Sequence, residues 1–363
     1  MQVLLLAALA AFFWFLADNV SSNLAARHIR SGVGFLTDSA GFDISESLVE
    51  FGAADHMWRA FVVGLLNTIR VSIISIITAF ILGAVVGIMR LAAHPIIRFL
   101  GAAHVEVYRN IPLIIQLMAV YLAITELLPM STSPVHFGSW ALLSKAGLQV
   151  AVPEAAGEAI LVTAAAGLAV FFVVRAAVSR RTTNLVAGLS GFGAGVAAAL
   201  VSWLACGFIG GWNKPEVQGF LIAGGAQFSP ELLAVWVGLT LFTSAAIAEI
   251  IRAGVLAVRY PQWEARLALG LTKVEVVSYI IFPQSMRLAI PPLTSQFMNL
   301  PKNSSLAVVV GYPDIVAVGN LSINVTGQAI EAIAIIMAVY LVLNLLTSVV
   351  MNAVNARVMR APQ

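Results

Sequence analysis

Residues 71–89 read VSIISIITAFILGAVVGIM and contain no charged side chain between Arg70 and Arg90. A helix needs about 20 predominantly apolar residues to cross the hydrocarbon core of a bilayer. The stretch therefore predicts a membrane-spanning helix.

The composition of the whole chain agrees with a membrane protein. Of its 363 residues, 60% are hydrophobic and 10% are charged, against roughly 25% charged in soluble proteins. A soluble core cannot absorb that much apolar surface, whereas a bilayer can. The net charge is +3 and the basic residues are scattered, so there is no basic patch to support a nucleic-acid partner.

The cysteine and histidine residues point to no redox or metal chemistry. The single cysteine, Cys206, lies among apolar and glycine residues, so an intrachain disulfide is excluded and we interpret it as a packing residue. None of the five histidines has a ligand spacing such as H-E-x-x-H. The sequence therefore predicts no metal site.

Apolar runs bounded by charged or turn residues predict an all-α integral membrane protein with about eight transmembrane helices. Besides residues 71–89, the expected spans are 1–17, 99–128, 158–178, 185–210, 232–256, 288–312 and 329–352. Residues 55–70 mix charged and apolar side chains and are expected to form an extension in the membrane interface. Residues 1–17 lack the basic start of a signal peptide, so we interpret them as a retained span. Whether Met1 is the natural start stays open.

The distribution of basic residues predicts the orientation. With the N-terminus inside, the cytoplasmic segments hold twelve of the twenty Lys and Arg residues and the opposite side holds six, while Arg109 and Lys302 fall within spans. This excess predicts an N-in, C-in topology by the positive-inside rule.

Residues 185–210 are rich in glycine, including Gly188, Gly191, Gly193 and Gly195. No predicted strand precedes them, so a nucleotide-binding loop is disfavoured, and small residues in membrane helices let neighbouring helices approach closely. We interpret Gly83 and Gly87 in the second span in the same way. The hairpin of residues 158–210 carries few polar residues, which is typical of a peripheral insertion outside a transport path.

The chain has no phosphate-binding P-loop of its own. That motif requires G-x-x-x-x-G-K-[ST], and none of the four lysines follows a glycine. If the protein belongs to a primary pump, a separate cytoplasmic ATPase must bind ATP and Mg and hydrolyse the ATP. The chain itself then needs no cofactor, but it needs a docking element.

The longest cytoplasmic connection, residues 257–284, is the candidate docking element. Pro261 fits a helix start, and residues 263–269 form a short amphipathic segment. Gly270 supplies a tight turn, because glycine accepts positive φ without a Cβ penalty. A second helical stretch follows, and Pro283 marks the return to the membrane. The pattern predicts a helix–turn–helix that inserts into a groove of a partner.

The spacing of this loop resembles a family motif. Its key residues are Glu264, Ala265, Gly270, Ile280 and Pro283. They resemble the EAA loop of permease subunits of binding-protein-dependent ABC importers, E-A-A-x3-G-x9-I-x-L-P. Two positions depart from the commonest form, namely Arg266 and Phe282. The resemblance implies that the ATPase couples to Glu264, Ala265, Arg266, Gly270 and Leu271.

Three further stretches resemble the polar amino-acid permeases of that family. Residues 106–116 read EVYRNIPLIIQ and resemble E-x-x-R-x-x-P-L-x-x-Q, while residues 248–254 (AEIIRAG) and 295–306 (SQFMNLPKNSSL) also look like that group. With its long first outer loop and extra hairpin, the chain most resembles the Q-type permease of general L-amino-acid importers.

This resemblance implies a five-helix permease core, to which the first span and the inserted helical hairpin are added. Residues 1–56 are expected to form the first helix and a long periplasmic loop, and residues 57–128 the first part of the core. Residues 129–230 are expected to form a periplasmic segment and the hairpin. Residues 231–363 complete the core and include the coupling loop.

Two pairs of opposite charges, Glu106 with Arg109 and Glu249 with Arg252, stand three residues apart near the cytoplasmic ends of their spans. Such i,i+3 pairs are local ion pairs on any helix. A gating role is the alternative, and both readings stay open.

The seventh span, residues 288–312, is unusually polar and is the candidate substrate path. Pro301 is expected to break it, and Lys302 lies about halfway along it. A lysine at that depth usually faces a cavity or a partner, and a broken helix frees backbone groups for a charged substrate. The candidates are Gln296, Asn299, Lys302, Asn303 and Ser304. Alternatively, Lys302 pairs with Asp314 and never meets substrate.

These observations predict a permease subunit of an ATP-driven importer in the bacterial plasma (inner) membrane, moving polar or general L-amino acids. The expected partners are two copies of a cytoplasmic ABC ATPase, a similar but distinct second permease, a periplasmic amino-acid-binding protein and membrane lipid. An ion-coupled secondary transporter is the alternative, but we find no internal repeat, and the docking loop is unexplained on that view. A membrane enzyme would need a catalytic constellation, and none is evident. Import rather than export rests on the resemblance.

Overall fold

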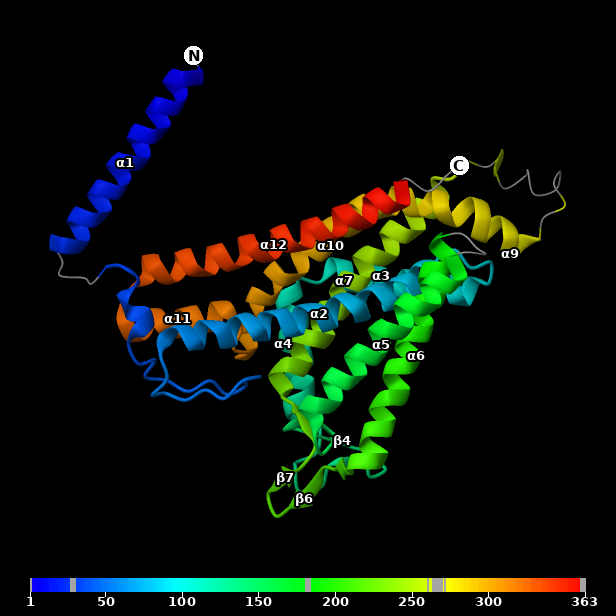
Figure 1. Ribbon diagram of the computed structural model, residues 1–363, viewed down its shortest axis with the longest axis horizontal. Helices are drawn as coiled ribbons and strands as arrows, with labels where there is room; N and C mark the ends of the chain where they lie inside the picture. Colours follow the sequence, from blue (N-terminus) through cyan, green and yellow to red (C-terminus); the bar gives the residue numbers. More distant parts are fainter. Residues whose placement is uncertain are drawn as a thin grey trace. The chain divides into compact units, whose positions relative to one another are not determined.

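The structure is a computed structural model that describes residues 2–26, 31–179, 184–259, 261–262, 270 and 272–359 (Figure 1). The chain divides into two compact units. Unit 1 comprises Met1–Met118 and Val235–Val358, and unit 2 comprises Ala119–Ala234 together with Met359–Gln363. Each unit is described by itself.

Unit 1 consists of helices and their connections. Its helices, three of which extend into unit 2, are α1 (Gln2–Ala26), α2 (Met57–Met89), α3 (Pro95–Asn110), α4 (Leu113–Leu122), α7 (Pro230–Leu256), α9 (Lys273–Val276), α10 (Phe282–Asn303), α11 (Ile315–Thr326) and α12 (Ala329–Met359). Shorter turns are the 3-10 helices Val33–Thr37 and Ser304–Val310 and the π-helical turn Val277–Ile281.

Helix α2 is longer than the apolar run that predicted it. It has 33 residues, which is about 50 Å against a hydrocarbon core of ~30 Å. Residues 57–70 extend the predicted span as part of the same helix, and their place in the membrane interface stays a prediction. Figure 1 shows α11 alongside this first half of α2. Phe35, Phe61 and Val318 are buried in the cluster between them, so this end has its own apolar core.

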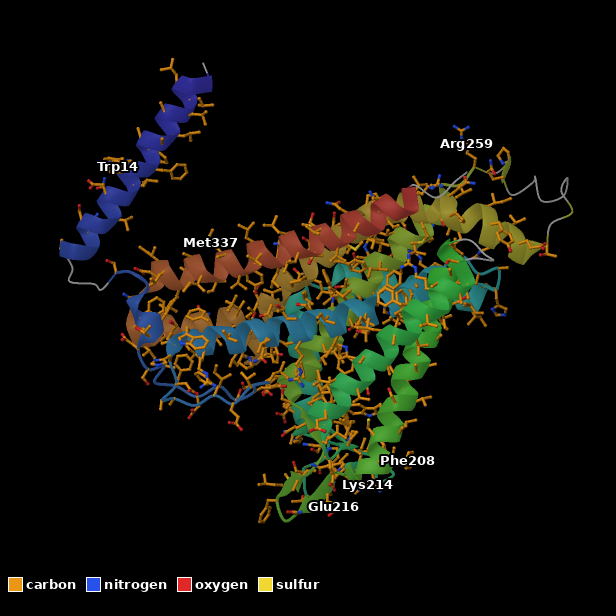
Figure 2. The ribbon with its side chains drawn as sticks, in the orientation of Figure 1. Trp14, Phe208, Lys214, Glu216, Arg259 and Met337 are labelled. Carbon is orange, nitrogen blue, oxygen red and sulfur yellow. The ribbon has the colours of Figure 1, made fainter. Side chains whose placement is uncertain are left out.

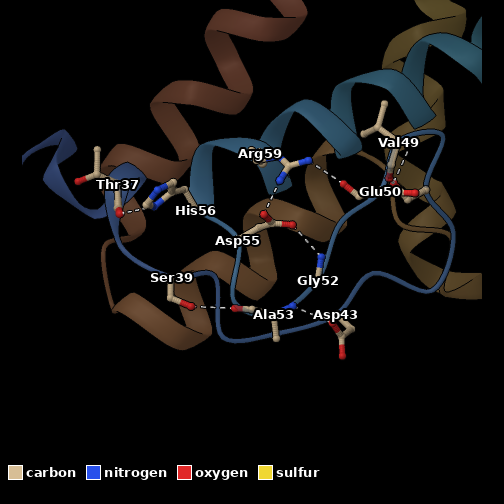
Figure 3. Close-up of polar contacts among 11 residues, drawn as sticks. Thr37, Ser39, Asp43, Val49, Glu50, Gly52, Ala53, Asp55, His56 and Arg59 are labelled. Carbon is tan, nitrogen blue, oxygen red and sulfur yellow. Dashed lines mark hydrogen bonds and ion pairs between the residues drawn. The ribbon is translucent and has the colours of Figure 1, made fainter.

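The loop before α2, residues 31–56, is folded by polar contacts (Figure 3). Asp55 forms an ion pair with Arg59 and accepts a hydrogen bond from the Gly52 amide at 3.0 Å. Arg59 also donates to the Glu50 carbonyl oxygen at 2.8 Å. Further along, Glu46 of the loop pairs with Arg70 of α2, and both side chains are largely buried. The loop is thus attached to α2 at two points, through Asp55 and Glu50 at Arg59 and through Glu46 at Arg70.

Glycines set the distance between the long helices of unit 1. A Cβ atom on Gly83 would lie 2.7 Å from Ile247 of α7, and one on Gly87 would lie 2.9 Å from the Ala248 carbonyl oxygen. Gly254 of α7 lies equally close to α10, because a Cβ atom on it would be 2.9 Å from the Ser285 carbonyl oxygen. The predicted packing role of Gly83 and Gly87 is confirmed.

Two helix pairs are bent, and one of them breaks where the sequence did not predict it. The axes of α3 and α4 meet at 105°, and those of the α10 segment and α11 at 54°. The expected break at Pro301 is wrong, because α10 continues through Pro301 to Asn303. Membrane helices tolerate proline when nearby groups satisfy the freed carbonyls. The chain turns instead at Gly311, whose φ of 80° suits glycine.

Unit 2 contains strands that the all-α expectation misses. One antiparallel sheet has the order β1-β2-β3-β8, and two-stranded ladders pair β4 with β5 and β6 with β7. The strands are β1 (Val135–Phe137), β2 (Ala141–Ser144), β3 (Gly147–Val150), β4 (Val152–Pro153), β5 (Trp212–Asn213), β6 (Glu216–Gln218), β7 (Leu221–Ala223) and β8 (Ala226–Phe228). With two to four residues each, they are too short to give a clear alternating pattern.

The hairpin of unit 2 consists of α5 (Ala156–Ser179) and α6 (Asn184–Gly210). A Cβ atom on Gly191 would lie 2.8 Å from the Phe171 carbonyl oxygen, and one on Gly195 2.8 Å from that of Gly167. Gly188 and Gly193 have no such neighbour within 4 Å. The packing interpretation therefore holds for two of the four glycines.

Five of the described helices are long and apolar enough to cross a membrane. If each of the two bent pairs is counted as one span, the number rises to seven. The five are Met57–Met89, Ala156–Ser179, Ser190–Gly210, Pro230–Leu256 and Ala329–Ala356. The apolar part of α1, Leu4–Val20, is shorter. A multi-pass membrane protein is thus confirmed, while the count of eight spans and the N-in, C-in orientation stay predictions.

Candidate functional site

Unit 1 contains a cavity of about 310 Å³ in which polar side chains of α10 face a cation of α3. The lining residues are Arg109 of α3, Phe242 and Ala246 of α7, and Gln296, Asn299 and Asn303 of α10. Three of the five predicted substrate-path residues therefore line one cavity, together with Arg109, for which the sequence predicted only an ion pair or a gate.

The end of α3 places Arg109 at this cavity. Pro112 has no amide hydrogen, so it leaves the carbonyl oxygen of Tyr108, four residues earlier, without its helical partner. Gln116 Nε2 donates to that oxygen at 2.9 Å and to the Ile111 carbonyl oxygen at 2.8 Å. Gln116 thereby stabilises the bend between α3 and α4 and fixes Arg109 in the last turn of α3. The spacing E-x-x-R-x-x-P-L-x-x-Q has this physical basis.

Glu106 does not pair with Arg109. Its carboxylate accepts a hydrogen bond from Asn110 Nδ2 at 3.2 Å, and no ion pair joins it to Arg109 in the described part of the chain. The Arg109 guanidinium is exposed and is available to a molecule in the cavity.

The polar wall of the cavity is one face of α10. Gln296, Asn299 and Asn303 stand at positions i, i+3 and i+7, which share a helix face. Each carboxamide offers both a donor and an acceptor, whereas a guanidinium only donates. The combination can bind a ligand that carries a carboxylate and an ammonium group.

The other two predicted path residues lie elsewhere. Lys302 is exposed and does not line the cavity, and Ser304 is buried, donating to the Pro301 carbonyl oxygen at 2.7 Å. Asp314 caps α11 by accepting from the Val316 and Ala317 amides. Within the described residues no ion pair links it to Lys302, so the predicted alternative pairing does not form.

A charge network lies where α2 ends beside α7. Arg252 donates to Glu249 Oε1 from Nη2 at 2.5 Å and from Nε at 3.1 Å, so this i,i+3 pair forms. Glu249 also forms an ion pair with Arg90, the residue after α2. Arg90 could not be predicted from the sequence as a partner of Glu249, because the two residues are 159 positions apart. The network ties α2 to the end of α7 that leads into the coupling loop.

Hydroxyl and ring contacts hold α2, α3 and α7 together near the cavity. Thr78 and Thr240 share a hydrogen bond of 2.7 Å, and Trp236 Nε1 donates to Thr78 Oγ1 at 3.1 Å. His104 of α3 lies 2.9 Å from Ser244 Oγ of α7. Two of these three helices, α3 and α7, contribute side chains to the cavity wall.

The two ends of the predicted coupling loop, residues 257–284, pack against each other. Val258 at its start and Val276 and Ile281 at its end are buried in one apolar cluster. Gly270 has a φ of 66°, in the left-handed region, as its predicted turn requires. Of the predicted coupling residues, Gly270 is described, whereas Glu264, Ala265, Arg266 and Leu271 lie outside the described residues.

A capping box begins the second helical stretch of this loop. The Glu275 amide donates to Thr272 Oγ1 at 3.3 Å, while the Glu275 carboxylate accepts from the Thr272 amide at 2.8 Å. These hydrogen bonds hold the pKa of Glu275 below its usual range. The T-x-x-E pattern at 272–275 signals this box in the sequence, but the sequence analysis did not use it.

Comparisons with known proteins agree on one family. The profile of the family described as binding-protein-dependent transport system inner membrane component matches residues 105–360. YhdX of Escherichia coli (strain K12), provisionally named an amino-acid ABC transporter permease protein, is 38% identical over 98% of this chain and 93% of its own length. The general L-amino acid transport system permease protein AapQ of Rhizobium johnstonii is 36% identical over 98% of this chain and 90% of its own.

One solved structure has a related fold. It is described as the crystal structure of an amino acid ABC transporter with histidines, and it is 21% identical to this chain. The match covers 83% of this chain and 94% of that one, with a TM-score of 0.50. At this identity the likeness concerns the fold alone.

Proposed function

The chain belongs to the family of binding-protein-dependent transport system inner membrane components, and from this premise we propose that it is the permease subunit of an ABC importer for polar L-amino acids. The observation that carries the proposal is the cavity of unit 1, where one guanidinium faces three carboxamides. The names of the relatives, which are amino-acid permeases, support the substrate class.

In this proposal the substrate carboxylate binds Arg109. A charge-assisted hydrogen bond there is stronger than one in bulk water, because the surrounding helices lower the local dielectric. The substrate ammonium donates to carboxamide oxygens of Asn299 and Asn303, and Gln296 completes the polar wall. Phe242 and Ala246 leave an apolar wall for the rest of the molecule.

ATP hydrolysis drives the transport from outside the chain. A partner ATPase binds ATP and Mg and docks on the loop 257–284, where Glu264, Ala265, Arg266, Gly270 and Leu271 form the centre of the contact. The apolar cluster of Val258, Val276 and Ile281 supports this role, because it joins the two ends of the loop and packs against Val255 of α7. The network of Arg90, Glu249 and Arg252 then passes the movement to α2.

The proposed assembly contains two copies of the ATPase, a similar second permease and a periplasmic amino-acid-binding protein. We assign the chain an N-in, C-in topology with eight spans, in which residues 57–128 and 231–363 form the permease core. Residues 1–56 form the first helix and its periplasmic loop, and residues 129–230 form an insertion outside the transport path. Lys302, exposed in the single chain, faces the second permease or the substrate path in this arrangement.

The test is amino-acid uptake into proteoliposomes that contain the complete complex. Arg109→Met should lower uptake about ten- to hundredfold, the loss of one hydrogen bond to a charged group, worth ~1.5–3 kcal/mol. Arg98→Met is the matched control, since Arg98 is an exposed arginine of the same helix that does not line the cavity. Equal uptake by both variants would contradict the assignment. Uptake that persists without ATP would favour the ion-coupled transporter instead.

A further inference from the structure

Unit 2 contains a second cavity, of about 480 Å³, beside the strands that leave the hairpin. Charged and amide side chains line most of it, next to one indole ring. The lining residues are Glu154, Trp212, Asn213, Lys214, Glu216, Gln218, Ala223 and Gly224. The proposed substrate path uses none of them.

Backbone pairing builds this cavity. Strands β4 and β5 pair Val152 with Asn213, and the Glu154 amide donates to the Gly211 carbonyl oxygen at 3.1 Å. Asn213 Oδ1 accepts from the Gly225 amide at 2.9 Å. The β4–β5 ladder and these two hydrogen bonds therefore set the positions of Glu154 and Asn213.

Aromatic rings position the lysine. Lys214 Nζ lies 5.1 Å from the ring centroid of Trp140, a cation–π distance. Trp140 in turn meets Trp212 edge to face at 5.0 Å, and Trp212 meets Phe208 of α6 at 6.1 Å. The ammonium group is thus held above an aromatic wall that continues onto the membrane helix.

The cavity lies beside the ends of two candidate membrane spans. Glu154 stands two residues before α5, and Trp212 two residues after the span that ends at Gly210. Just inside that end, Phe208 and Ile209 are 73% and 88% exposed. Figure 2 shows Phe208, Lys214 and Glu216 at the same end of α6. Tryptophan and lysine are the residue types that anchor helices at the membrane interface.

The charges around the cavity are complementary to a ligand with two charges. Lys214 forms no ion pair with Glu154 or Glu216 among the described residues. A ligand that brought only an anion would leave the carboxylates unmatched, and one that brought only a cation would leave the lysine unmatched. The cavity therefore fits a molecule that carries a primary ammonium and an anionic group.

We propose that this cavity binds the headgroup of an aminophospholipid, with the phosphate at Lys214 and the ammonium at Glu154 and Glu216. The acyl chains then lie along the exposed apolar side chains at the end of α6. A free amino acid has the same pair of charges, but the neighbouring ends of two candidate spans and the exposed Phe208 and Ile209 favour the lipid. The site needs only a hairpin that crosses the membrane, and it does not depend on the transported substrate.

The experiment is native mass spectrometry of the intact complex in nanodiscs that contain equal amounts of phosphatidylethanolamine and phosphatidylglycerol. We expect phosphatidylethanolamine to be retained on the unsubstituted complex. Lys214→Met should lower its retention about tenfold, and Lys214→Arg should restore much of it. The double substitution Glu154→Gln with Glu216→Gln should shift the preference toward phosphatidylglycerol, which has phosphate but no ammonium. Lys145→Met is the control, since Lys145 belongs to unit 2 and does not line the cavity.

Equal retention by the unsubstituted complex, the Lys214→Met variant and the Lys145→Met variant would overturn the proposal. So would displacement of the lipid by millimolar free glutamine, because the cavity would then be a site for amino acids. The Lys214→Arg variant distinguishes the loss of the charged contact from misfolding of unit 2. If removal of the lysine misfolds the unit, both variants lose the lipid, whereas a lost contact is restored by arginine.

Discussion

Helix α10 and the hairpin α5–α6 are both built to lie in a bilayer, yet their polar groups are used differently. In α10 three carboxamides share one face and line a cavity with Arg109. In the hairpin the close contacts are made by glycines, and the charged residues of the helices, Glu158 and Arg175, stand near their ends. The comparison teaches that apolar content identifies the membrane-spanning segments, whereas polar side chains that share one face of a helix identify the candidate binding site.

The largest expected effect is a loss of stability when Gly83 of α2 is replaced, compared with Gly193 of the hairpin. Gly83→Val places new atoms against Ile247 and the Ser244 carbonyl oxygen, because a Cβ atom there already lies within 2.8 Å of both. Overpacking of this kind typically costs about 1–3 kcal/mol, so thermal melting of the purified subunit should shift down strongly. Gly193→Val is the control, since a Cβ atom on Gly193 has no neighbour within 4 Å. Equal melting of both variants would break the comparison.

The second prediction concerns the loops that join the helices of each region. Gly270→Val should abolish coupled uptake while ATP hydrolysis continues or the ATPase dissociates, because a β-branched residue at φ 66° is strained by roughly 1–2 kcal/mol. Uptake and ATPase activity of the purified complex check this. Two glycines inserted at 180–183, the connection of the hairpin, should leave both activities unchanged. Crosslinking of the ATPase only to 180–183 would contradict the docking assignment.

A smaller effect is expected from single polar groups. Asn299→Leu removes one carboxamide from the cavity and should lower uptake about two- to tenfold, the value of one hydrogen bond of ~0.5–1.5 kcal/mol. Thr163→Val removes a hydroxyl from α5 that has no hydrogen-bond partner among the residues that the structure describes, so it should not alter uptake. Initial rates at several substrate concentrations compare the two, and a larger loss from the α5 variant would reverse the comparison.

The smallest effect concerns selectivity. Residues 156–210 can be replaced by a short glycine linker, since the Glu154 amide and the Gly211 carbonyl oxygen that flank them are 3.1 Å apart. Assembly is expected to suffer, but a complex that assembles should keep the relative KM values of its amino-acid substrates. Uptake competition among several amino acids measures this, and a changed order of preference would place the hairpin in the transport path.

Much of the fold follows from local sequence, because a span needs only a continuous apolar run. The run at 71–89 predicts α2, and the spacing around Gly270 predicts the turn in the coupling loop. The strands of unit 2 could not be predicted in this way, since two to four residues give no period. The break expected at Pro301 is wrong, because α10 accommodates that proline and turns at Gly311.

The candidate site was predicted in part for a similar reason. The polarity of α10 is visible in the sequence, so Gln296, Asn299 and Asn303 could be found. The place of Arg109 in the cavity could not be found in this way. It depends on a bend that Gln116 stabilises and on the approach of α3 to α10 in space. The partner of Glu249 at Arg90 was missed for the same reason.

The central claim is that the cavity between α3, α7 and α10 holds the transported amino acid by its carboxylate. A structure of the complete complex with a bound amino acid tests it most directly. We predict the substrate carboxylate within hydrogen-bonding distance of the Arg109 guanidinium, with the ammonium against Asn299 or Asn303. A substrate bound at Lys302 and away from Arg109, or outside these three helices, would contradict the account.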